Sequence, residues 1–497
     1  MSELKHLQNG SDIRGIACEG VAGEDVNLTP AIANRIGQAF AYWLANKLGK
    51  DVKDLTIGLG HDSRVTADSL IEATSAGILS TGAKAVACGL VSTPSMFMTV
   101  VFPETAFDGS IMITASHLPF NRNGLKFFDK DGGLEKADIT DILERASKLE
   151  EGKTDQKADR MDILSLYCTS LCEKIRAGVN ANDYEHPLAG LRITVDAGNG
   201  AGGFFVDKVL QPLGADTTGS QFLEPDGYFP NHIPNPEDKK AMKAIQDAVL
   251  ANHSDLGIIF DTDVDRMSAV LPNGEAVNRD AIIAMMAAIL VKDYPGSTVV
   301  TDSVTSDRLT RFLEGKLGMK QHRFQRGYKN VINECKRLNS EGIVSPLAIE
   351  TSGHGALSEN YFLDDGAYLA VKMLIATALA KKENKALASY IEGLEPEFEG
   401  REYRMKLLGE DFKAYGQDVL KGFEENAKTN GYTVVTPSYE GVRLQFDGGW
   451  ALLRLSLHDP LMPLNIEGSK EGDCDKIKEV IAKLLSSFDK LDTTILK

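Results

Sequence analysis

The chain has 497 residues, with 54 lysines and arginines against 71 aspartates and glutamates, so its formal net charge is −17. Domains usually hold about 100–200 residues, so this length predicts several domains with sizeable cores. The acidic balance disfavours general nucleic-acid binding, because it repels a phosphate backbone, whereas a local basic pocket can still take a small anionic substrate. Six cysteines in so long a chain do not predict a disulfide framework.

No segment predicts a membrane span or a targeting peptide. The N-terminal residues lack the apolar run of a secretory signal. The longest apolar stretch, residues 281–291, is shorter than the ~20 residues that cross a bilayer, and it predicts a buried helix. We therefore expect a cytoplasmic protein without membrane contact.

Short apolar strands, each followed by a polar loop and an amphipathic helix, recur through most of the chain. Alternating strands and helices predict α/β domains with mixed sheets, and ligands are expected beyond the carboxyl ends of the strands. The expected strands lie at residues 55–59, 110–113, 193–195, 256–260, 298–300 and 347–349.

The C-terminal part has a different pattern. Residues 434–467 alternate between apolar and polar, and a helical pattern follows at residues 474–488. Together they predict an antiparallel α+β domain. We therefore expect three related α/β domains and one α+β domain around a central cleft. Charged or glycine-containing connectors suggest the bounds 1–160, 161–275, 276–398 and 399–497.

Three carboxylates, Asp261, Asp263 and Asp265, alternate directly after the expected strand 256–260, and Arg266 follows them. Charges this close repel one another unless a cation neutralises them. Oxygen ligands at this density suit Mg²⁺. A solvated acidic turn is the plainer interpretation, but the position at a strand end beside an arginine favours a metal site.

Two further loops carry reactive side chains. Ser116 follows the expected strand 110–113 and is next to His117, and Lys126 lies only one loop further along the chain. This combination suits a nucleophile or phosphate carrier. The segment Glu350-Thr351-Ser352-Gly353-His354 follows the expected strand 347–349. Its side chains suit paired sugar hydroxyls, and a histidine can transfer a proton near neutral pH.

Together these loops resemble the α-D-phosphohexomutase superfamily, in particular its phosphomannomutase/phosphoglucomutase branch. The phosphoserine loop of that family matches residues 114–119 and 123–126, its metal loop matches 261–266, and its sugar loop matches 350–354. Supporting matches lie at residues 12–15, 196–200 and 327–329. The matches follow the family order over essentially the whole chain.

Two parts of the chain depart from the family pattern. Leu118 stands where the family usually has asparagine. The final phosphate loop, usually Arg-x-Ser-x-Thr-Glu-Pro, appears at residues 454–460 with His458 and Asp459 in place of Thr and Glu. The choice among glucose, mannose and glucosamine phosphates therefore stays open.

The resemblance implies that the chain interconverts hexose 1-phosphate and hexose 6-phosphate. The implied route runs through a phosphoserine enzyme and a hexose 1,6-bisphosphate, which also primes the serine. The resemblance further implies that Mg²⁺ is held by Ser116, Asp261, Asp263 and Asp265. The implied catalytic residues are Ser116, Lys126, His354, Arg14 and His117, and the implied binders of the sugar phosphate are Arg266, Lys329, Glu350, Ser352, Arg454, Ser456 and His458.

Three alternatives stay open. A phosphotransferase of the same family could release hexose 1,6-bisphosphate, or a degenerate paralogue could bind sugar phosphates without turnover. A haloacid-dehalogenase-type phosphatase would use an aspartate of residues 261–263 as its nucleophile, but it leaves Ser116 and the loop at Glu350 unexplained. The sequence leaves the oligomeric state open.

Overall fold

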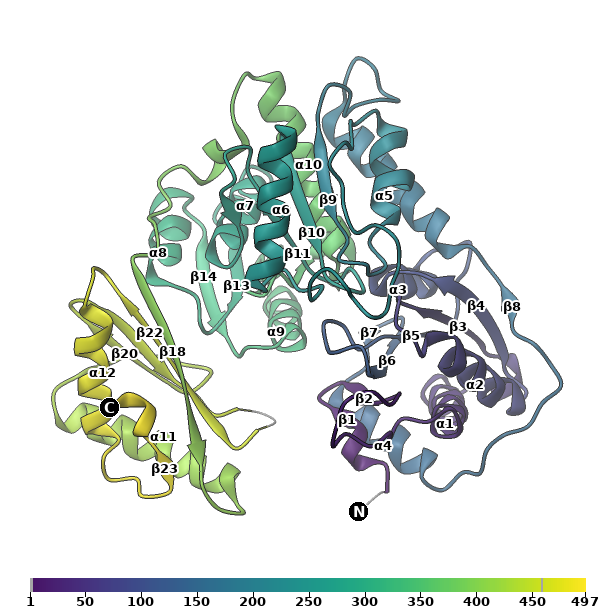
Figure 1. The fold of residues 1–497 in the computed structure, drawn as a ribbon, viewed down its shortest axis with the longest axis horizontal. Coiled ribbons are helices and arrows are strands. Elements are labelled where there is room, and N and C mark those ends of the chain that lie inside the picture. The colour runs from purple at the N-terminus through teal and green to yellow at the C-terminus, as the bar shows by residue number, and fades with distance from the viewer. Residues whose placement is uncertain (1–2, 457–458) are drawn as a thin grey trace. The chain divides into compact units, whose positions relative to one another are not determined.

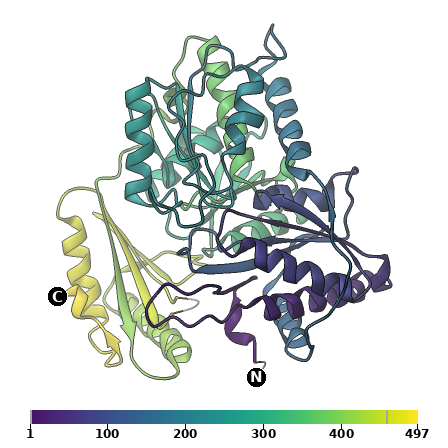
Figure 2. The same ribbon diagram turned by 45° about the vertical axis from the view of Figure 1, so that its right-hand side comes forward.

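The computed structural model describes residues 3–456 and 459–497. The chain forms two compact units, Met1–Ile289 with Ser352–Tyr390 (unit 1) and Leu290–Thr351 with Ile391–Lys497 (unit 2). Figures 1 and 2 show the strands and helices of both. The four domain bounds expected from the sequence stay predictions.

The first sheet of unit 1 has the strand order β1-β2-β6-β5-β3-β4-β8, and β7 pairs with β6. Strands β5, β3, β4 and β8 are parallel to one another, whereas β6 and β2 run antiparallel to their neighbours, so the sheet is mixed. The strands are β1 Gln8–Asn9, β2 Asp12–Ile16, β3 Thr56–His61, β4 Lys84–Leu90, β5 Gly109–Ile113, β6 Arg122–Asp129, β7 Gly132–Gly133 and β8 Asp159–Arg160.

Helices cover this sheet, and Figure 1 shows α1 and α2 together over it. The helices here are α1 Pro30–Leu48, α2 Ala67–Ser80, α3 Thr93–Val101 and α4 Lys136–Ala146. Helix α1 begins at Pro30, where the Thr29 side chain accepts from Ile32 N, and Gly49, with a φ of 64°, caps its C-terminal end. Its Phe40 packs on Phe127 of β6, with ring centroids 5.0 Å apart, inside the core of this sheet.

The second sheet of unit 1 has the order β12-β11-β10-β9, in which β9 and β10 are parallel and the others antiparallel. The residues 272–275 form the turn between β11 and β12, so this sheet extends to Val277. Two strands, β16 and β17, form an antiparallel hairpin in the same unit. The elements are α5 Ile163–Val179, β9 Ile193–Asp196, α6 Lys239–Asn252, β10 Leu256–Phe260, β11 Met267–Val270, β12 Ala276–Val277, α7 Asp280–Leu290, β16 Gly355–Leu357, β17 Leu363–Asp364 and α10 Gly366–Lys382.

Unit 2 holds a parallel set of strands in the order β14-β13-β15 and an antiparallel sheet in the order β19-β20-β21-β22-β18-β23. Helices α11 and α12 pack their apolar faces on the antiparallel sheet, with Phe423 and Ile481 in its core. The elements are β13 Thr298–Asp302, α8 Asp307–Thr310, β14 Lys320–Phe324, α9 Tyr328–Ser340, β15 Leu347–Ile349, β18 Glu399–Leu407, α11 Phe412–Thr429, β19 Thr433–Val434, β20 Val442–Phe446, β21 Gly449–Leu453, β22 Leu461–Gly468, α12 Asp473–Leu484 and β23 Leu491–Asp492.

The predicted fold class, α/β domains with mixed sheets and a C-terminal α+β domain, is confirmed. Each expected strand is present within one or two residues. The C-terminal helix ends at Leu484, four residues before the expected end, and the next amides, Ser486 N and Phe488 N, donate to carbonyls three residues back, as in a turn. All six cysteines are free. Within the described ranges, no helix is both long and apolar enough to cross a membrane.

Candidate active site

Ser116 lies in the loop between β5 and β6, and its φ of 50° is left-handed, which is uncommon for a residue with a Cβ. The side chain is buried, with 9% of the residue exposed. Its Oγ donates a hydrogen bond of 3.0 Å to Asp261 Oδ2 and lies 3.3 Å from His117 Nδ1. The structure therefore brings the predicted nucleophile directly to the acidic loop.

The acidic loop begins where β10 ends, and all three of its carboxylates are buried. Val264, a β-branched residue, has a φ of 66° in the middle of the loop, a strained conformation of the kind that clusters at functional sites. One oxygen of each carboxylate lies within 4.8 Å of the others. Among the residues that the structure describes, Oδ1 of Asp263 and Oδ1 of Asp265 have no hydrogen-bond partner.

The electrostatics of this loop fit a hard cation. Burial and the charges of Asp265 and Asp263 raise the pKa of Asp261 well above its usual range. Burial would also raise the pKa of Asp265, but the charges of Lys126, His354 and Arg266 outweigh it and hold that pKa below its usual range. Converging buried carboxylates with spare oxygens are the donor set that Mg²⁺ binds, and the ion would relieve their repulsion.

Arg266 joins the serine to the acidic loop. Its Nη2 donates to Ser116 Oγ at 3.2 Å, to Asp261 Oδ2 at 3.2 Å and to His117 Nδ1 at 2.7 Å. Because a guanidinium only donates, Nδ1 of His117 accepts and its imidazole is neutral. Burial and the charge of Arg266 accordingly lower the pKa of His117 to about 3. On its other side, Arg266 Nη1 donates to Asn235 Oδ1 at 3.1 Å.

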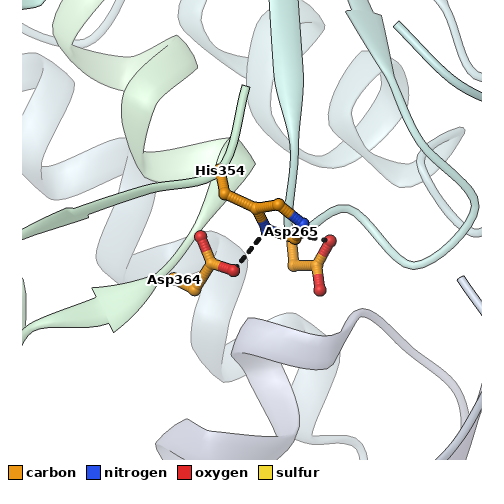
Figure 3. Close-up of side chains that lie close together, drawn as sticks. All are labelled: Asp265, His354 and Asp364. Carbon is orange, nitrogen blue, oxygen red and sulfur yellow. Dashed lines mark hydrogen bonds and ion pairs between the residues drawn. The ribbon is translucent and has the colours of Figure 1, made fainter. Parts of the chain in front are cut away.

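Lys126 and His354 contact the later carboxylates of the acidic loop, those of Asp263 and Asp265. Lys126 Nζ donates to Asp263 Oδ2 at 3.2 Å and also to Asp265 Oδ2. His354 Nδ1 lies 2.5 Å from Asp364 Oδ2 and 3.8 Å from Asp265 Oδ1 (Figure 3). Burial would lower the pKa of His354, but Asp364 and Asp265 raise it to about 9, so the imidazolium is favoured.

Arg14 supports the serine loop from β2. Its guanidinium donates to the carbonyl of Thr114 and, at 2.9 Å, to Asp12 Oδ2. The pairing of β2 with β6 sets Arg14 opposite Gly124. Five predicted residues, Ser116, His117, Lys126, Arg266 and His354, thus share one site with the buried acidic loop in unit 1, and Arg14 holds the backbone next to it.

Sequence models of the phosphoglucomutase/phosphomannomutase α/β/α domains I, II and III match residues 5–153, 167–274 and 278–398. The chain belongs to the phosphoglucomutase/phosphomannomutase family. The phosphomannomutase/phosphoglucomutase of Pseudomonas aeruginosa is 25% identical over 90% of this chain and 92% of its own. Membership of this family identifies the chain as an enzyme of the phosphohexomutase type.

Solved structures support the fold assignment. A phosphoglucomutase/phosphomannomutase family protein from Burkholderia thailandensis superposes with a TM-score of 0.77 at 24% identity, covering 97% of this chain and 98% of that one. The N-acetylphosphoglucosamine mutase of Aspergillus fumigatus, solved in complex with GlcNAc-6P and magnesium, has a TM-score of 0.51 at 14% identity, covering 76% of this chain and 88% of that one.

The remaining predicted residues of this phosphohexomutase lie mostly in unit 2. Glu350 is buried and its Oε1 accepts from Gly327 N at 2.6 Å, next to the N-terminus of α9, which carries Lys329. Arg454 and Ser456 follow β21, in the loop that leads to β22. The backbone amide of Arg454 donates to the carbonyl of Pro463 in β22. Ser352 is buried in unit 1, and His458 lies outside the described residues.

The guanidinium of Arg454 in unit 2 has a charged neighbour and one nitrogen without a hydrogen bond among the described residues. Its Nη1 lies 3.9 Å from Glu440 Oε1, and its Nε is buried without a hydrogen-bond partner among the described residues. Burial lowers the pKa of Arg454, and the nearby charge of Arg326 adds to this effect. Glu440 also accepts from Arg326 N at 3.1 Å, so it bridges the segment before Gly327 and the loop of Arg454.

Sequence reasoning missed several residues that shape the site. Asp364 pairs with His354, Asn235 pairs with Arg266, and Thr93 Oγ1 donates to Asp263 Oδ2 at 2.5 Å. Arg64 donates to main-chain carbonyls of the serine loop. Arg64 stands in the polar loop after an expected strand, and that position could have marked it as a candidate. Asp364 and Asn235 have no comparable local feature in the sequence.

Proposed function

We propose that the chain interconverts hexose 1-phosphate and hexose 6-phosphate through a phosphoserine at Ser116. The observation that carries this proposal is the 3.0 Å hydrogen bond from Ser116 Oγ to an acidic loop in which two buried oxygens have no hydrogen-bond partner among the described residues. A hydroxyl held against a site for a divalent cation and a buried guanidinium suits phosphoryl transfer, which needs positioning and charge neutralisation above all.

In this proposal Asp261, Asp263, Asp265 and the phosphorylated Ser116 hold Mg²⁺. When bound, Mg²⁺ would act as a Lewis acid on the phosphoryl oxygens and neutralise their charge. Arg266 supplies a further positive group, since its Nη2 already donates to Ser116 Oγ at 3.2 Å. The magnesium in the complex of the Aspergillus fumigatus enzyme supports the choice of ion.

The first transfer breaks the bond between phosphorus and Ser116 Oγ and forms a bond from phosphorus to the free sugar hydroxyl. The proton of that hydroxyl passes to the leaving Ser116 Oγ, and Lys126, His354 and Arg14 are the candidates for relaying it or polarising the hydroxyl. Return of the other phosphoryl group to Ser116 reverses these changes and releases the isomer. His117, which accepts from Arg266 in the resting site, orients the phosphoryl group in this scheme.

The remaining predicted residues bind the sugar phosphate in this proposal. Glu350 and Ser352 read sugar hydroxyls, and Lys329, Arg454, Ser456 and His458 hold the phosphate that does not react. The buried Nε of Arg454 has no hydrogen-bond partner among the described residues, which supports the assignment of Arg454 to an anion. Hexose 1,6-bisphosphate serves as intermediate and as the primer that phosphorylates Ser116.

A coupled assay tests the proposal with glucose, mannose and glucosamine 1-phosphates, each with and without glucose 1,6-bisphosphate. We expect isomerisation that the bisphosphate stimulates, and intact mass spectrometry should find one phosphoryl group on Ser116. Ser116→Ala should lose activity by at least about 1,000-fold. Ser110→Ala, which alters another buried serine six residues away, is the matched control and should retain it.

The same assay separates the alternatives. Steady release of inorganic phosphate without isomerisation would favour a phosphatase. Accumulation of free hexose 1,6-bisphosphate would favour the bisphosphate-producing phosphotransferase. Tight binding without turnover in primed enzyme would indicate a degenerate paralogue. Each of these results overturns the proposed isomerase.

A further inference from the structure

The guanidinium of Arg64 lies beneath the serine loop and is almost completely buried, with 2% of the residue exposed. It donates to four main-chain carbonyls of that loop. The acceptors are the carbonyl oxygens of Ser116 at 2.5 Å, Leu118 at 2.6 Å, Pro119 at 2.8 Å and Arg122 at 2.8 Å. A single side chain therefore gathers most of the loop that carries the proposed nucleophile.

A second line of contacts starts from the same segment and reaches the other side of Ser116. Asp62 Oδ1 accepts from Arg64 N at 3.0 Å, and its Oδ2 accepts from Thr114 Oγ1 at 2.6 Å. Thr114 Oγ1 in turn accepts from Ser116 N at 2.9 Å. The carbonyl of Ser116 is thus held by Arg64, and its amide is held through Thr114 by Asp62.

These contacts bear on the conformation of Ser116. A residue with a Cβ keeps a φ of 50° only where its surroundings over-determine the backbone. Arg64 and the pair of Asp62 and Thr114 supply that restraint at both peptide groups of Ser116. Because the guanidinium binds only main-chain oxygens of the loop, the restraint does not depend on the side chain at position 118, where this chain carries leucine.

We propose that Arg64 is a positioning residue for phosphoryl transfer, which holds Ser116 Oγ at the acidic loop in both the free and the phosphorylated serine. This inference rests on the proposed function, since it takes Ser116 as the phosphate carrier. Arg64 acts through the backbone of the loop and touches neither Asp261 nor the reacting oxygen. Misplacement of a reacting group by about 1 Å can cost about 100-fold in rate.

Arg64→Lys is the direct test. A lysine keeps the charge but has one ammonium group, which cannot span four carbonyls. We expect kcat to fall by about 100-fold and KM to stay within about threefold, because loop geometry is altered and sugar binding is not. Turnover is expressed per phosphorylated Ser116, counted by mass spectrometry after incubation with glucose 1,6-bisphosphate, so that unfolded or unprimed enzyme does not contribute.

Arg192→Lys is the matched control. Arg192 belongs to the same unit, donates to the carbonyl of Asn252 at 2.7 Å and pairs with Asp216, far from the serine loop in sequence. Its replacement should leave turnover unchanged. If Arg64→Lys does not fold, Thr114→Val decides instead, since it removes the acceptor for Ser116 N and should lower turnover about tenfold.

The result that overturns the inference is normal turnover per phosphorylated Ser116 in Arg64→Lys, or in Thr114→Val if only that variant folds. Failure of the proposed function gives a different result. In that case the wild-type enzyme is not phosphorylated on Ser116, or Ser116→Ala keeps its activity. Both results are obtained without any variant of Arg64.

Discussion

Ser116 Oγ donates a hydrogen bond of 3.0 Å to Asp261, a residue 145 positions further along the chain. The two residues follow strands of different sheets, β5 and β10. Thr93 and Lys126, from the part of unit 1 that carries β5, also bond to Asp263 of the acidic loop. The predicted nucleophile and the predicted metal ligands therefore form one connected site inside a single compact unit, and this connection makes the following predictions specific.

The acidic loop should bind Mg²⁺ and be stabilised by it. A ligand that binds only the folded state stabilises by about 2.7 kcal/mol when its concentration is about 100 times its Kd. We expect Mg²⁺ to raise the Tm of the wild type and EDTA to reverse the rise. Asp263→Asn should abolish this response, because it removes one of three converging carboxylates. Asp247→Asn, on an exposed carboxylate, is the control, and an equal Mg²⁺ response in Asp263→Asn would contradict the assignment.

Asn235 should matter for turnover through Arg266. Its Oδ1 accepts from Arg266 Nη1 at 3.1 Å, and the same guanidinium reaches Ser116 Oγ through Nη2. Loss of one orienting hydrogen bond to a charged group costs about 1.5–3 kcal/mol, so Asn235→Ala should lower kcat by about 10- to 100-fold. Steady-state kinetics measures this change. Asn430→Ala, which alters an exposed residue of unit 2, is the control and should leave kcat unchanged. An unchanged kcat in Asn235→Ala would show that Asn235 does not orient Arg266 for the reaction.

Gly200 should not tolerate a Cβ. An added Cβ would lie 2.7 Å from Thr262 O and 2.8 Å from Thr262 Cα, and these are backbone atoms of the acidic loop. Gly200→Ala should therefore displace that loop and weaken the Mg²⁺ response in a thermal-shift titration. In Gly315→Ala the Cβ meets no atom within 4 Å, so this variant is the control. A Mg²⁺ affinity in Gly200→Ala equal to the wild type would show that the loop can move aside.

His232 should make stability depend on pH. Its Nδ1 donates to Ile233 O at 2.9 Å and its Nε2 lies 3.0 Å from Asp196 Oδ2, so both ring nitrogens carry protons. Burial would lower the pKa of His232, but Asp196 outweighs it and raises that pKa above 6.5.

The sign of the effect follows from this shift. The stabilisation is fully present below pH 6.5, the unperturbed value, and is lost as the pH rises through the higher pKa of the folded state. His232→Gln cannot titrate, so the Tm advantage of the wild type over this variant should shrink as the pH rises above 6.5. His6→Gln, at an exposed histidine, is the control. A constant Tm difference across the pH range would disprove the charged pair.

The sequence by itself determined the fold class and the loops that carry the reactive groups. Apolar strands such as β10 and the polar loops after them are local features, because alternation and turn residues act over a few neighbouring positions. The acidic loop and Ser116 could be recognised for the same reason. Their left-handed residues, Ser116 and Val264, could not, since neither side chain favours that conformation and only the packed surroundings impose it.

Tertiary structure alone decided which groups support the reactive ones. Arg64 is separated from Ser116 by 52 positions, and Asn235 from Arg266 by 31. A local pattern predicts a charged side chain in a loop as solvated, and only folding shows that Arg64 is buried against four carbonyls. The physical reason is that burial of a guanidinium is favourable only where acceptors from distant segments converge on it, and such convergence is a property of the assembled sheets.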